Sequence, residues 1–359
     1  MHLMVNTSGG DAPGLNAVIR SVVVAARQRG WRVTGIRHGY EGLLSGEAGG
    51  LVPLDRHAVR GITGQGGSIL GTINKGDPFQ YPLAQDGKTV LADISNRVVA
   101  RFREVGADAL IAIGGDGTMR ISQRFFEKGL PLVGVPKTID NDLALTDYTF
   151  GFDTAVSIAT EAIDRLHTTA EAHRRVMVVE LMGRYAGWIA LHAGVAGTAD
   201  VVLIPEIPFD LEKVCAKVRA REAEGRHFSM VVVAEGAKPI GGNLSISATE
   251  AGREVRLGGL AEKLAAAIEA RTGKECRSLV LGHLQRGGGP TAFDRTLALR
   301  FGAAAVRLVE RQAFGRMVAL QHTRIVDVAI KDAVATMKAV PLDYDLVQTA
   351  RDLAICLGD

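Results

Sequence analysis

Short apolar runs of strand length recur along the chain, and most of them are separated by stretches with helical spacing. The runs that predict strands are residues 2–5, 32–36, 109–113, 131–135, 176–181, 201–204, 230–234, 278–282 and 317–321. Apolar residues at helical spacing predict helices over residues 16–30, 147–175 and 257–273. Runs that are apolar at every position predict parallel strands, because helices then cover both faces of the sheet.

The alternation of strand and helix predicts an α/β fold of two Rossmann-like lobes, each a mainly parallel sheet covered by helices. A long helix leaving the first sheet places a lobe boundary near residue 150. The larger lobe is expected at residues 1–150 plus about 285–330, and the smaller at about 151–284 plus 331–359. Ligands of such folds bind beyond the carboxyl ends of the strands, so we expect the active site in the cleft between the lobes.

Composition narrows the class of protein. The 359 residues are 47% hydrophobic, which is ample for a large core. The 42 basic and 39 acidic residues are scattered and nearly balanced, which disfavours nucleic acid as a partner. Cys215, Cys276 and Cys356 are far apart in the sequence, so neither a disulfide framework nor a zinc site is indicated, and a reducing compartment fits.

The amino-terminal segment and the longest apolar runs bear on location. The chain passes from a few apolar residues directly into a glycine turn, which is too short for the apolar region of a signal peptide. No apolar run approaches the length of a membrane span. We therefore expect a soluble, cytoplasmic protein with no membrane partner.

Two glycine-rich loops follow predicted strands and open helices. In TSGGDAPGLNAVIR (7–20), Gly9 and Gly10 let a phosphate approach the backbone, and the helix amino end favours its charge. In ALIAIGGDGT (109–118), Asp116 is a candidate carboxylate for a metal ion, and Gly117 leaves room for a ligand. Plain turns between strand and helix remain the alternative for both loops. Neither loop is GxGxxG or GxxxxGK[ST], and GGDGT alone also resembles NAD kinases and lipid kinases.

The acidic loop PKTIDND (136–142) follows the strand predicted over 131–135. Asp140 and Asp142 are expected on the same side of an extended backbone, where one can serve as a base and the other can face a metal ion. Lys137 can neutralise phosphate charge nearby. A solvated acidic turn with a surface lysine is the alternative. With the two glycine loops, this pattern predicts phosphoryl transfer.

Basic residues follow two later strands. MGRYAG (182–187) places Arg184 where a guanidinium group can meet the charge on a transferred phosphoryl group. GHLQRGG (282–288) offers His283 and Arg286 beside a glycine turn, which suits a sugar phosphate. A lone histidine or arginine at a strand end is more often structural. Two such clusters in a chain that already carries the acidic loops favour an anion site.

Seven motifs in this order resemble the phosphofructokinase family, specifically the bacterial 6-phosphofructokinases. They are TSGGDAPGLNAVIR, GGSILG, GGDGT, PKTIDND, MGRYAG, AEG and GHLQRGG. The resemblance runs from about residue 2 to residue 325, and the tail over 340–359 is similar to cyanobacterial-type members. It implies transfer of a phosphoryl group from ATP to the 1-hydroxyl of fructose 6-phosphate, with Mg²⁺ as cofactor. The larger lobe would bind the donor and the smaller lobe fructose 6-phosphate.

The resemblance also implies a role for each matched residue. Asp140 would be the base, Thr138, Arg184 and Lys137 would serve the transferring phosphoryl group, and Asp116 and Asp142 would serve Mg²⁺. The donor-binding positions are Gly10, Tyr40, Asp116, Gly117 and Thr118. The sugar-phosphate positions are Thr138, Asp140, Arg175, Met182, Gly183, Arg184, Glu235, Arg277, His283 and Arg286. In this family Arg175 and Arg277 reach the 6-phosphate of a neighbouring subunit, so a homo-oligomer, commonly a tetramer, is implied.

The identity of the phosphoryl donor rests on two positions that disagree. Family members that use pyrophosphate usually carry Asp in place of Gly117, so Gly117 favours ATP, whose α-phosphate needs that space. Lys137 is typical of pyrophosphate-dependent members, which leaves a pyrophosphate-dependent phosphotransferase as the alternative. Asn74 replaces an arginine that contacts donor phosphate in well-known members, and Lys75 or Lys137 is expected to supply that charge.

Two further expectations concern regulation and loss of function. Arg20, Arg56 and Asp200 match the family's effector site, but Val24 and His167 stand where further arginines are usual, so effector control is expected to be weak or altered. A non-catalytic regulatory subunit is disfavoured, because such a subunit would be expected to lose the base, Asp140.

Overall fold

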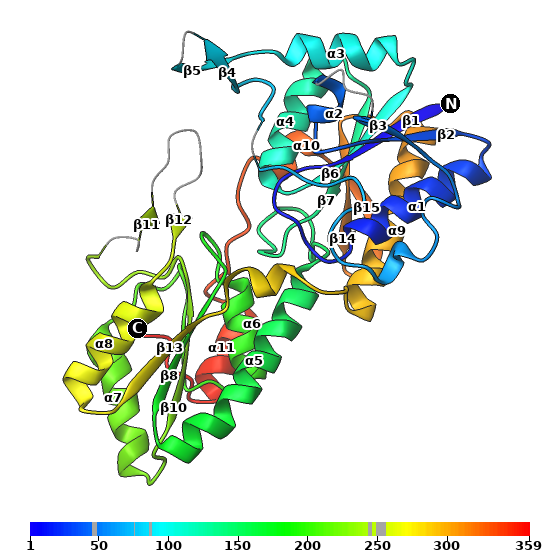
Figure 1. Cartoon of the computed structure of the whole chain (residues 1–359). Coiled ribbons are helices and arrows are strands. Elements are labelled where there is room, and N and C mark those ends of the chain that lie inside the picture. The colour runs from blue at the N-terminus through cyan, green and yellow to red at the C-terminus, as the bar shows by residue number, and fades with distance from the viewer. Residues whose placement is uncertain (45–48, 75, 86–87, 243–245, 249–255) are drawn as a thin grey trace. The chain divides into compact units, whose positions relative to one another are not determined.

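The computed structural model describes residues 1–44, 49–74, 76–85, 88–242, 246–248 and 256–359. The chain divides into two compact units. Unit 1 consists of residues 1–139, 143–153 and 286–337, and unit 2 of residues 140–142, 154–285 and 338–359. Each unit is built on its own sheet (Figure 1).

Unit 1 contains a seven-stranded sheet. In spatial order its strands are β15 (Arg324–Ala329), β14 (Arg316–Gln321), β7 (Leu132–Pro136), β6 (Ala109–Gly114), β1 (His2–Thr7), β2 (Arg32–Ile36) and β3 (Leu51–Leu54). The inner pairs are parallel, and each edge strand, β3 or β15, runs antiparallel to its neighbour. The carboxyl ends of β1, β6 and β7 therefore meet at one edge, where Asn6 pairs with Ala112 and Ala112 with Gly134.

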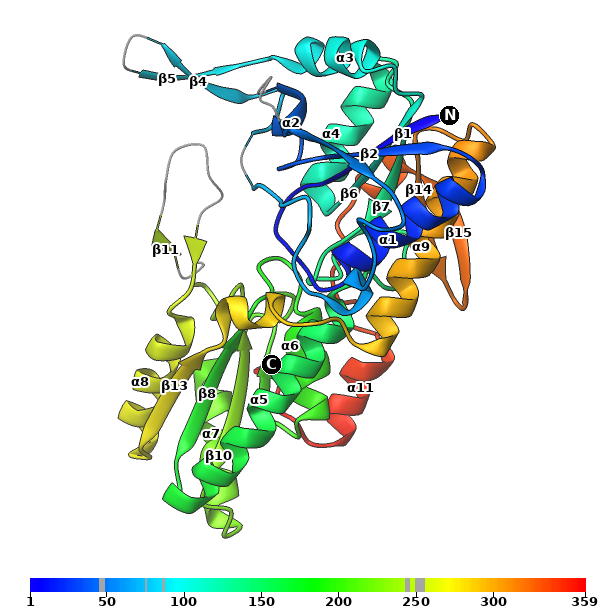
Figure 2. The same ribbon diagram turned by 45° about the vertical axis from the view of Figure 1, so that its right-hand side comes forward.

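Both faces of this sheet are buried. Leu3 and Val5 lie in one hydrophobic core and Met4 lies in another, as the alternating directions of strand side chains require. Helices α1 (Leu15–Gln28) and α9 (Ala292–Glu310) cover the first face (Figures 1 and 2). The second face is covered by α2 (Glu41–Leu44), α3 (Ser95–Glu104), α4 (Asp116–Glu127) and α10 (Ile330–Ala333). The strands read as unbroken apolar runs for this reason.

Unit 2 contains a four-stranded, fully parallel sheet. Its strands, in spatial order, are β13 (Cys276–Val280), β8 (Val176–Leu181), β10 (Ser229–Ala234) and β9 (Val201–Leu203). Helices α7 (Leu211–Ala223) and α8 (Leu260–Thr272) pack on one face, and α5 (Phe152–His173), α6 (Trp188–Ala196) and α11 (Asp345–Asp352) lie on the other side (Figures 1 and 2).

The predicted α/β fold with mainly parallel, helix-covered sheets is confirmed. Each predicted strand is present, although β13 begins at Cys276 and not at residue 278. The predicted helices correspond to α1, α5 and α8. Short elements that the pattern did not predict include the hairpin strands β4 (Tyr81–Gln85), β5 (Lys88–Ala92), β11 (Ile246–Ala248) and β12 (Arg256–Leu257), and the 3₁₀ turns η1 (Ile62–Gly64) and η2 (Gly282–Arg286). Within the described ranges, no helix is long and apolar enough to cross a membrane.

Candidate active site

The glycine loop between β1 and α1 presents its backbone at the sheet edge. Gly9 has a φ of 79°, and the Thr72 hydroxyl donates to its carbonyl at 2.5 Å. Gly14, with a φ of 109°, precedes α1, and no side chain caps the helix there. A Cβ on Gly10 would lie 2.9 Å from Nη1 of Arg286, which donates to the Asp11 carbonyl at 3.0 Å. The loop therefore joins unsatisfied helix amide groups to a guanidinium group, a combination suited to anions.

A second amide-rich terminus lies at the start of α4. Thr118 is buried, and a Cβ on Gly114 would lie only 2.2 Å from its hydroxyl oxygen, so glycine is required there. Asp116 is partly exposed and pairs with Arg120 at 2.7 Å. A Cβ on Gly117 would meet nothing within 4 Å. The first turn of α4 is thus open beside Gly117 and acidic at Asp116.

Lys137 connects these two termini. Its side chain is 3% exposed, and its ammonium group donates to the carbonyl of Gly10. The same nitrogen would lie 3.3 Å from a Cβ on Gly9, and the Lys137 backbone N–H donates to Gly114 at 2.9 Å. The structure therefore brings the two predicted glycine loops together around a buried cation, at the ends of β1, β6 and β7. The predicted surface alternative for Lys137 is wrong.

The acidic loop turns sharply between its two aspartates. Asn141 is buried and has a φ of 52°, which is left-handed backbone. The extended backbone expected between Asp140 and Asp142 is therefore wrong, because the residue between them is left-handed. Asp140 and Asp142 are half-buried, and the Asp142 carbonyl accepts from the backbone N–H of Lys338 at 2.9 Å. The Thr138 carbonyl accepts from the Thr149 hydroxyl at 2.7 Å, which fixes the start of the loop.

Tyr40 is the one predicted donor-binding side chain that lies in a hydrophobic core. It is 3% exposed, and its ring centroid lies 5.0 Å from that of Phe125. Burial raises the pKa of its phenol to about 12, so the group is protonated at neutral pH. The Tyr40 side chain therefore contributes to the core and not to an open site.

In unit 2, the loop after β8 carries Arg184 and is held by close backbone packing. Gly183 has a φ of 139°, and its carbonyl accepts from the Gly236 N–H at 3.1 Å. A Cβ on Gly236 would lie 1.9 Å from the Arg184 carbonyl, so only glycine fits at that position. Arg184 is half-buried, and Glu235, immediately before Gly236, is also half-buried. The Arg184 loop and the end of β10 thus form one packed corner.

The GHLQRGG motif spans the boundary between the two units. Its first four residues belong to unit 2, and Arg286 belongs to unit 1. Gln285 is buried, and its side-chain oxygen accepts from the Met182 N–H at 3.4 Å. His283 is exposed. Sequence reasoning missed the role of Gln285, although the residue stood inside a motif already singled out.

Arg175 and Arg277 share one carboxylate. Arg175 Nε lies 2.8 Å from Glu275 Oε2, and Arg277 pairs with the other oxygen of the same residue. The hydrogen bond from Arg175 is the main reason that the pKa of Glu275 is lowered. Glu275, which the sequence did not single out, keeps the two guanidinium groups next to each other at the exposed edge strand β13.

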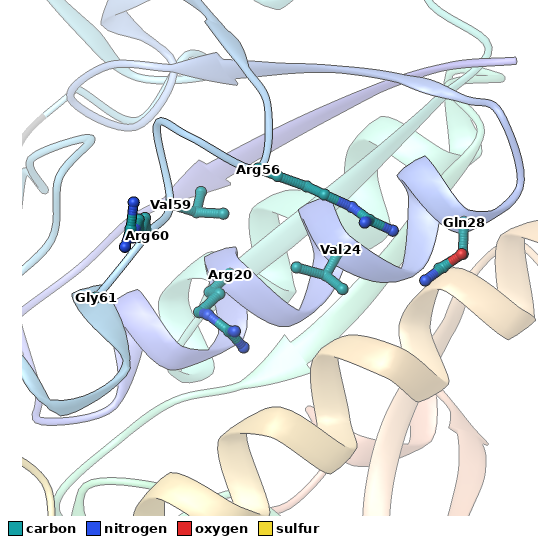
Figure 3. A pocket seen from close by; sticks show the side chains of 7 residues that line it. All are labelled: Arg20, Val24, Gln28, Arg56, Val59, Arg60 and Gly61. Atoms are coloured by element: carbon teal, nitrogen blue, oxygen red, sulfur yellow. The ribbon is translucent and has the colours of Figure 1, made fainter.

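A pocket of about 250 Å³ lies on unit 1, away from the glycine loops, between α1 and the segment that precedes η1 (Figure 3). It is lined by Arg20, Val24, Gln28, Arg56, Val59, Arg60 and Gly61. Arg20 and Arg56, two predicted effector residues, are therefore neighbours, and Val24 lies in the same row of α1. Asp200 is inside unit 2, where Arg221 pairs with it at 2.7 Å and the Met230 N–H bonds to it at 2.8 Å.

Carboxylates are the candidate metal ligands of this site. Among the described residues, no three His, Cys, Asp or Glu side chains form a cage for a metal ion. Mg²⁺ commonly binds through one or two carboxylates together with substrate phosphates and water, so a preformed cage is not needed. The carboxylate of Asp116, partly exposed at an amide-rich helix terminus, is a donor of the type that Mg²⁺ prefers.

Glycine loops at two helix amino ends, a buried cation between them and an acidic loop that follows a parallel strand are typical of phosphoryl-transfer enzymes of the α/β class. The sequence profile of the family described as Phosphofructokinase matches residues 2–309, and the chain belongs to this family. An ATP-dependent 6-phosphofructokinase from Chloroflexus aggregans is 52% identical over 99% of this chain and 97% of that protein. A pyrophosphate–fructose 6-phosphate 1-phosphotransferase from Streptomyces coelicolor is also 52% identical, over 97% of this chain and 98% of that protein. The solved phosphofructokinase from Saccharomyces cerevisiae superposes with a TM-score of 0.80, at 28% identity, covering 99% of this chain and 47% of that one.

Proposed function

We propose that the protein is an ATP-dependent 6-phosphofructokinase. It transfers the γ-phosphoryl group of ATP to the 1-hydroxyl of fructose 6-phosphate and releases fructose 1,6-bisphosphate and ADP. The observation that carries the choice of ATP is the open space at Gly117, in the first turn of α4. Among the relatives at 52% identity, those from Chloroflexus are named as ATP-dependent, which supports this choice, and one from Streptomyces coelicolor is named as pyrophosphate-dependent, so the level of identity alone does not select the donor.

In this proposal unit 1 binds the donor. The backbone of Gly10, Tyr40, Gly117 and Thr118 faces the donor phosphates, and the helix termini favour their charge. Lys137, held at the carbonyl of Gly10, supplies the positive charge that Asn74 lacks. Lys75, the other candidate for this charge, lies outside the described residues. Asp116 and Asp142 would hold Mg²⁺, which supplies positive charge for the developing negative charge of the phosphates.

Unit 2 provides most of the acceptor site. Asp140 accepts the proton of the 1-hydroxyl while its oxygen bonds to the γ-phosphorus and the bond to ADP breaks. Thr138 and Arg184 hold the transferring phosphoryl group. The sugar phosphate is held by Met182, Gly183, Glu235 and His283, together with Arg286 of unit 1.

Arg175 and Arg277 serve the 6-phosphate of a neighbouring subunit, which makes the active enzyme a homo-oligomer and, in keeping with the family, a tetramer. Arg277 is exposed on the edge strand β13, and Glu275 holds the half-buried Arg175 beside it, which supports this assignment, because a second chain can reach such a pair. We place the enzyme in the cytoplasm. The pocket at Arg20 has Val24 in place of a cation, which supports weak or altered effector control.

Parallel assays with ATP and with pyrophosphate, each with fructose 6-phosphate and Mg²⁺, test the donor. The proposal predicts fructose 1,6-bisphosphate formation with ATP at a kcat/KM at least tenfold above that with pyrophosphate. The reverse ratio would establish the pyrophosphate-dependent alternative. Absence of product with either donor would disprove the proposed activity.

A substitution of Asp140, the proposed base, tests the alternative that the protein is a non-catalytic regulatory subunit. Asp140→Asn keeps the size of the side chain and removes its ability to take a proton. Turnover should fall by several orders of magnitude while fructose 6-phosphate still binds, as measured by calorimetry. Full activity of the variant would remove Asp140 from the role of base.

A further inference from the structure

A short segment of the carboxyl-terminal region, Lys338–Val340, bonds to two loops that the proposed function requires. We call this segment the strap. The backbone N–H of Lys338 donates to the Asp142 carbonyl at 2.9 Å. The Lys338 carbonyl accepts from Nε1 of Trp188 at 2.8 Å, and the Val340 N–H donates to Oε1 of Glu206 at 2.8 Å. All of these residues belong to unit 2.

Glu206 is the anchor on the opposite side of the strap. Its two carboxylate oxygens lie 3.0 and 3.1 Å from the backbone nitrogen of Gly187, which precedes α6. Oε1 also accepts from Val340, so one half-buried carboxylate bonds both to the start of α6 and to the strap. No side chain of the cap residue itself serves α6, and the helix amino end favours a negative charge. Burial raises the pKa of Glu206, although its backbone hydrogen bonds oppose that shift.

Trp188, the first residue of α6, completes the attachment. It is 6% exposed, and its ring makes an edge contact with Tyr344, with centroids 5.3 Å apart. The ammonium group of Lys338 lies 5.3 Å from the centroid of the Trp188 ring. The strap is therefore fixed to α6 by a hydrogen bond, a cation–π contact and an aromatic contact, and not by chain connectivity alone.

The hydrogen bonds of the strap and of Glu206 lie close in sequence to two residues of the proposed catalytic site. Asp142 is two residues after Asp140, the proposed base. Gly187 is three residues after Arg184, the proposed ligand of the transferring phosphoryl group. The two loops are far apart in sequence, and the strap with Glu206 connects them within one unit through the hydrogen bonds at Asp142, Gly187 and Trp188.

Resting on the proposed function, we infer that Glu206 and the strap are positioning elements that hold the Asp140 loop and the Arg184 loop in register for phosphoryl transfer. Their loss would let the base and the guanidinium group drift by a fraction of an ångström to about 1 Å, a displacement that can cost as much as a hundredfold in rate. The carboxyl-terminal region is therefore part of the catalytic framework.

The main test compares Glu206→Ala with Glu206→Gln. Alanine removes every acceptor, whereas glutamine keeps one oxygen for Val340 and Gly187. We expect Glu206→Ala to lower kcat at least tenfold and to change the KM for the donor less than about threefold. Glu206→Gln should restore kcat to within about threefold of the original protein. Glu224→Ala, at an exposed glutamate of the same unit, is the matched control and should leave kcat unchanged.

A second variant covers the case in which Glu206→Ala does not fold. Trp188→Phe keeps an aromatic ring near Tyr344 and Lys338, but it deletes the donor to the Lys338 carbonyl and leaves a smaller ring at a buried site. It should lower kcat several-fold while the protein stays folded, with a reduced melting temperature. The chain has two tryptophans, so Trp31→Phe leaves Trp188 as the only tryptophan, whose emission can be excited apart from that of the tyrosines. In that background, Glu206→Ala should shift the Trp188 emission to the red while the protein stays folded, because the strap separates from α6.

The outcomes separate the two proposals. A kcat within twofold of the original in folded Glu206→Ala and in Trp188→Phe overturns the inference, whatever the donor. A fall in kcat that merely follows the loss of folded protein, with no rescue by Glu206→Gln, also overturns it. If the unmodified enzyme makes no fructose 1,6-bisphosphate with either donor, the proposed function fails. In that case only the fluorescence experiment tests the role of the strap. An unchanged Trp188 emission in folded Glu206→Ala then refutes the inference.

Discussion

The substitution Gly117→Asp separates the effect of charge at the donor site from effects on folding. A Cβ at Gly117 meets nothing within 4 Å, and the residue lies in the first turn of α4. Aspartate there removes the helix penalty of glycine and adds a negative charge where the helix dipole favours one. Each of these two effects should raise the free energy of unfolding by some tenths of a kcal/mol. The free energy of unfolding should therefore stay the same or rise by about 0.5 kcal/mol.

The effect on ATP should be opposite and larger. Two unit charges about 4 Å apart repel by about 4 kcal/mol when the effective dielectric constant is about 20. Screening by Mg²⁺ and salt reduces this, so we take about 2–4 kcal/mol as the loss of transition-state binding. Because about 1.4 kcal/mol corresponds to a factor of ten, kcat/KM for ATP should fall about 30- to 1000-fold.

The assay measures formation of fructose 1,6-bisphosphate with ATP and with pyrophosphate, and urea unfolding is followed on the same preparations. Gly117→Asn has nearly the same shape without the charge, and Gly117→Ala adds only the Cβ. The ratio between the asparagine and aspartate variants isolates the charge. A value of kcat/KM for ATP in Gly117→Asp within threefold of the original would refute the argument that the open space at Gly117 receives a nucleotide phosphate.

Three further predictions concern packing, assembly and regulation. Gly236→Ala should lower the free energy of unfolding by about 2 kcal/mol or more, because its Cβ would lie 1.9 Å from the Arg184 carbonyl. Urea titration beside Gly117→Ala, where nothing lies within 4 Å, checks this, and equal stability of the two variants contradicts it. Arg277→Ala should raise the KM for fructose 6-phosphate at least tenfold. Refolding this variant together with an equal amount of Asp140→Asn should restore about a quarter of the original activity, because about half of the subunit pairs are then mixed and each mixed pair has one intact site out of two. No recovery in the mixture would argue against a site shared between subunits. Fructose 6-phosphate saturation should shift less than twofold with ADP or phosphoenolpyruvate, since Val24 adds no charge to the pocket at Arg20, whereas a large shift with either compound would refute altered control.

The strands were predictable because both faces of each central strand are buried. Leu3, Met4 and Val5 are all apolar for that reason, although they belong to two different cores. The edge strand β15 was missed because it is only half-buried and carries Asp327, which pairs with Arg316 at 2.8 Å across the antiparallel pair. A charge inside a short run weakens the apolar signal, even though an edge strand tolerates it.

The loops of the candidate site were predictable from the sequence, but the burial, hydrogen bonds and backbone conformation of their residues were not. Motifs placed Lys137 near phosphates, yet only the fold shows that it is buried and bonded to Gly10. The turn at Asn141 depends on one left-handed residue, which a strand pattern does not show. Glu206 carries no motif, since its partners are backbone N–H groups contributed by residues far away in the sequence. Contacts of this kind follow from packing, which a local pattern does not contain.

The shared carboxylate of Glu275 has a consequence for turnover. If Arg175 and Arg277 hold the 6-phosphate of a neighbouring subunit, the two guanidinium groups are not left unpaired when the product dissociates, because both can pair with Glu275 again. An internal anion that competes with the bound phosphate lowers the affinity for that phosphate and raises its rate of dissociation. On the proposed function, Glu275 would act as an internal counter-ion that lowers the affinity for the 6-phosphate and makes its exchange faster.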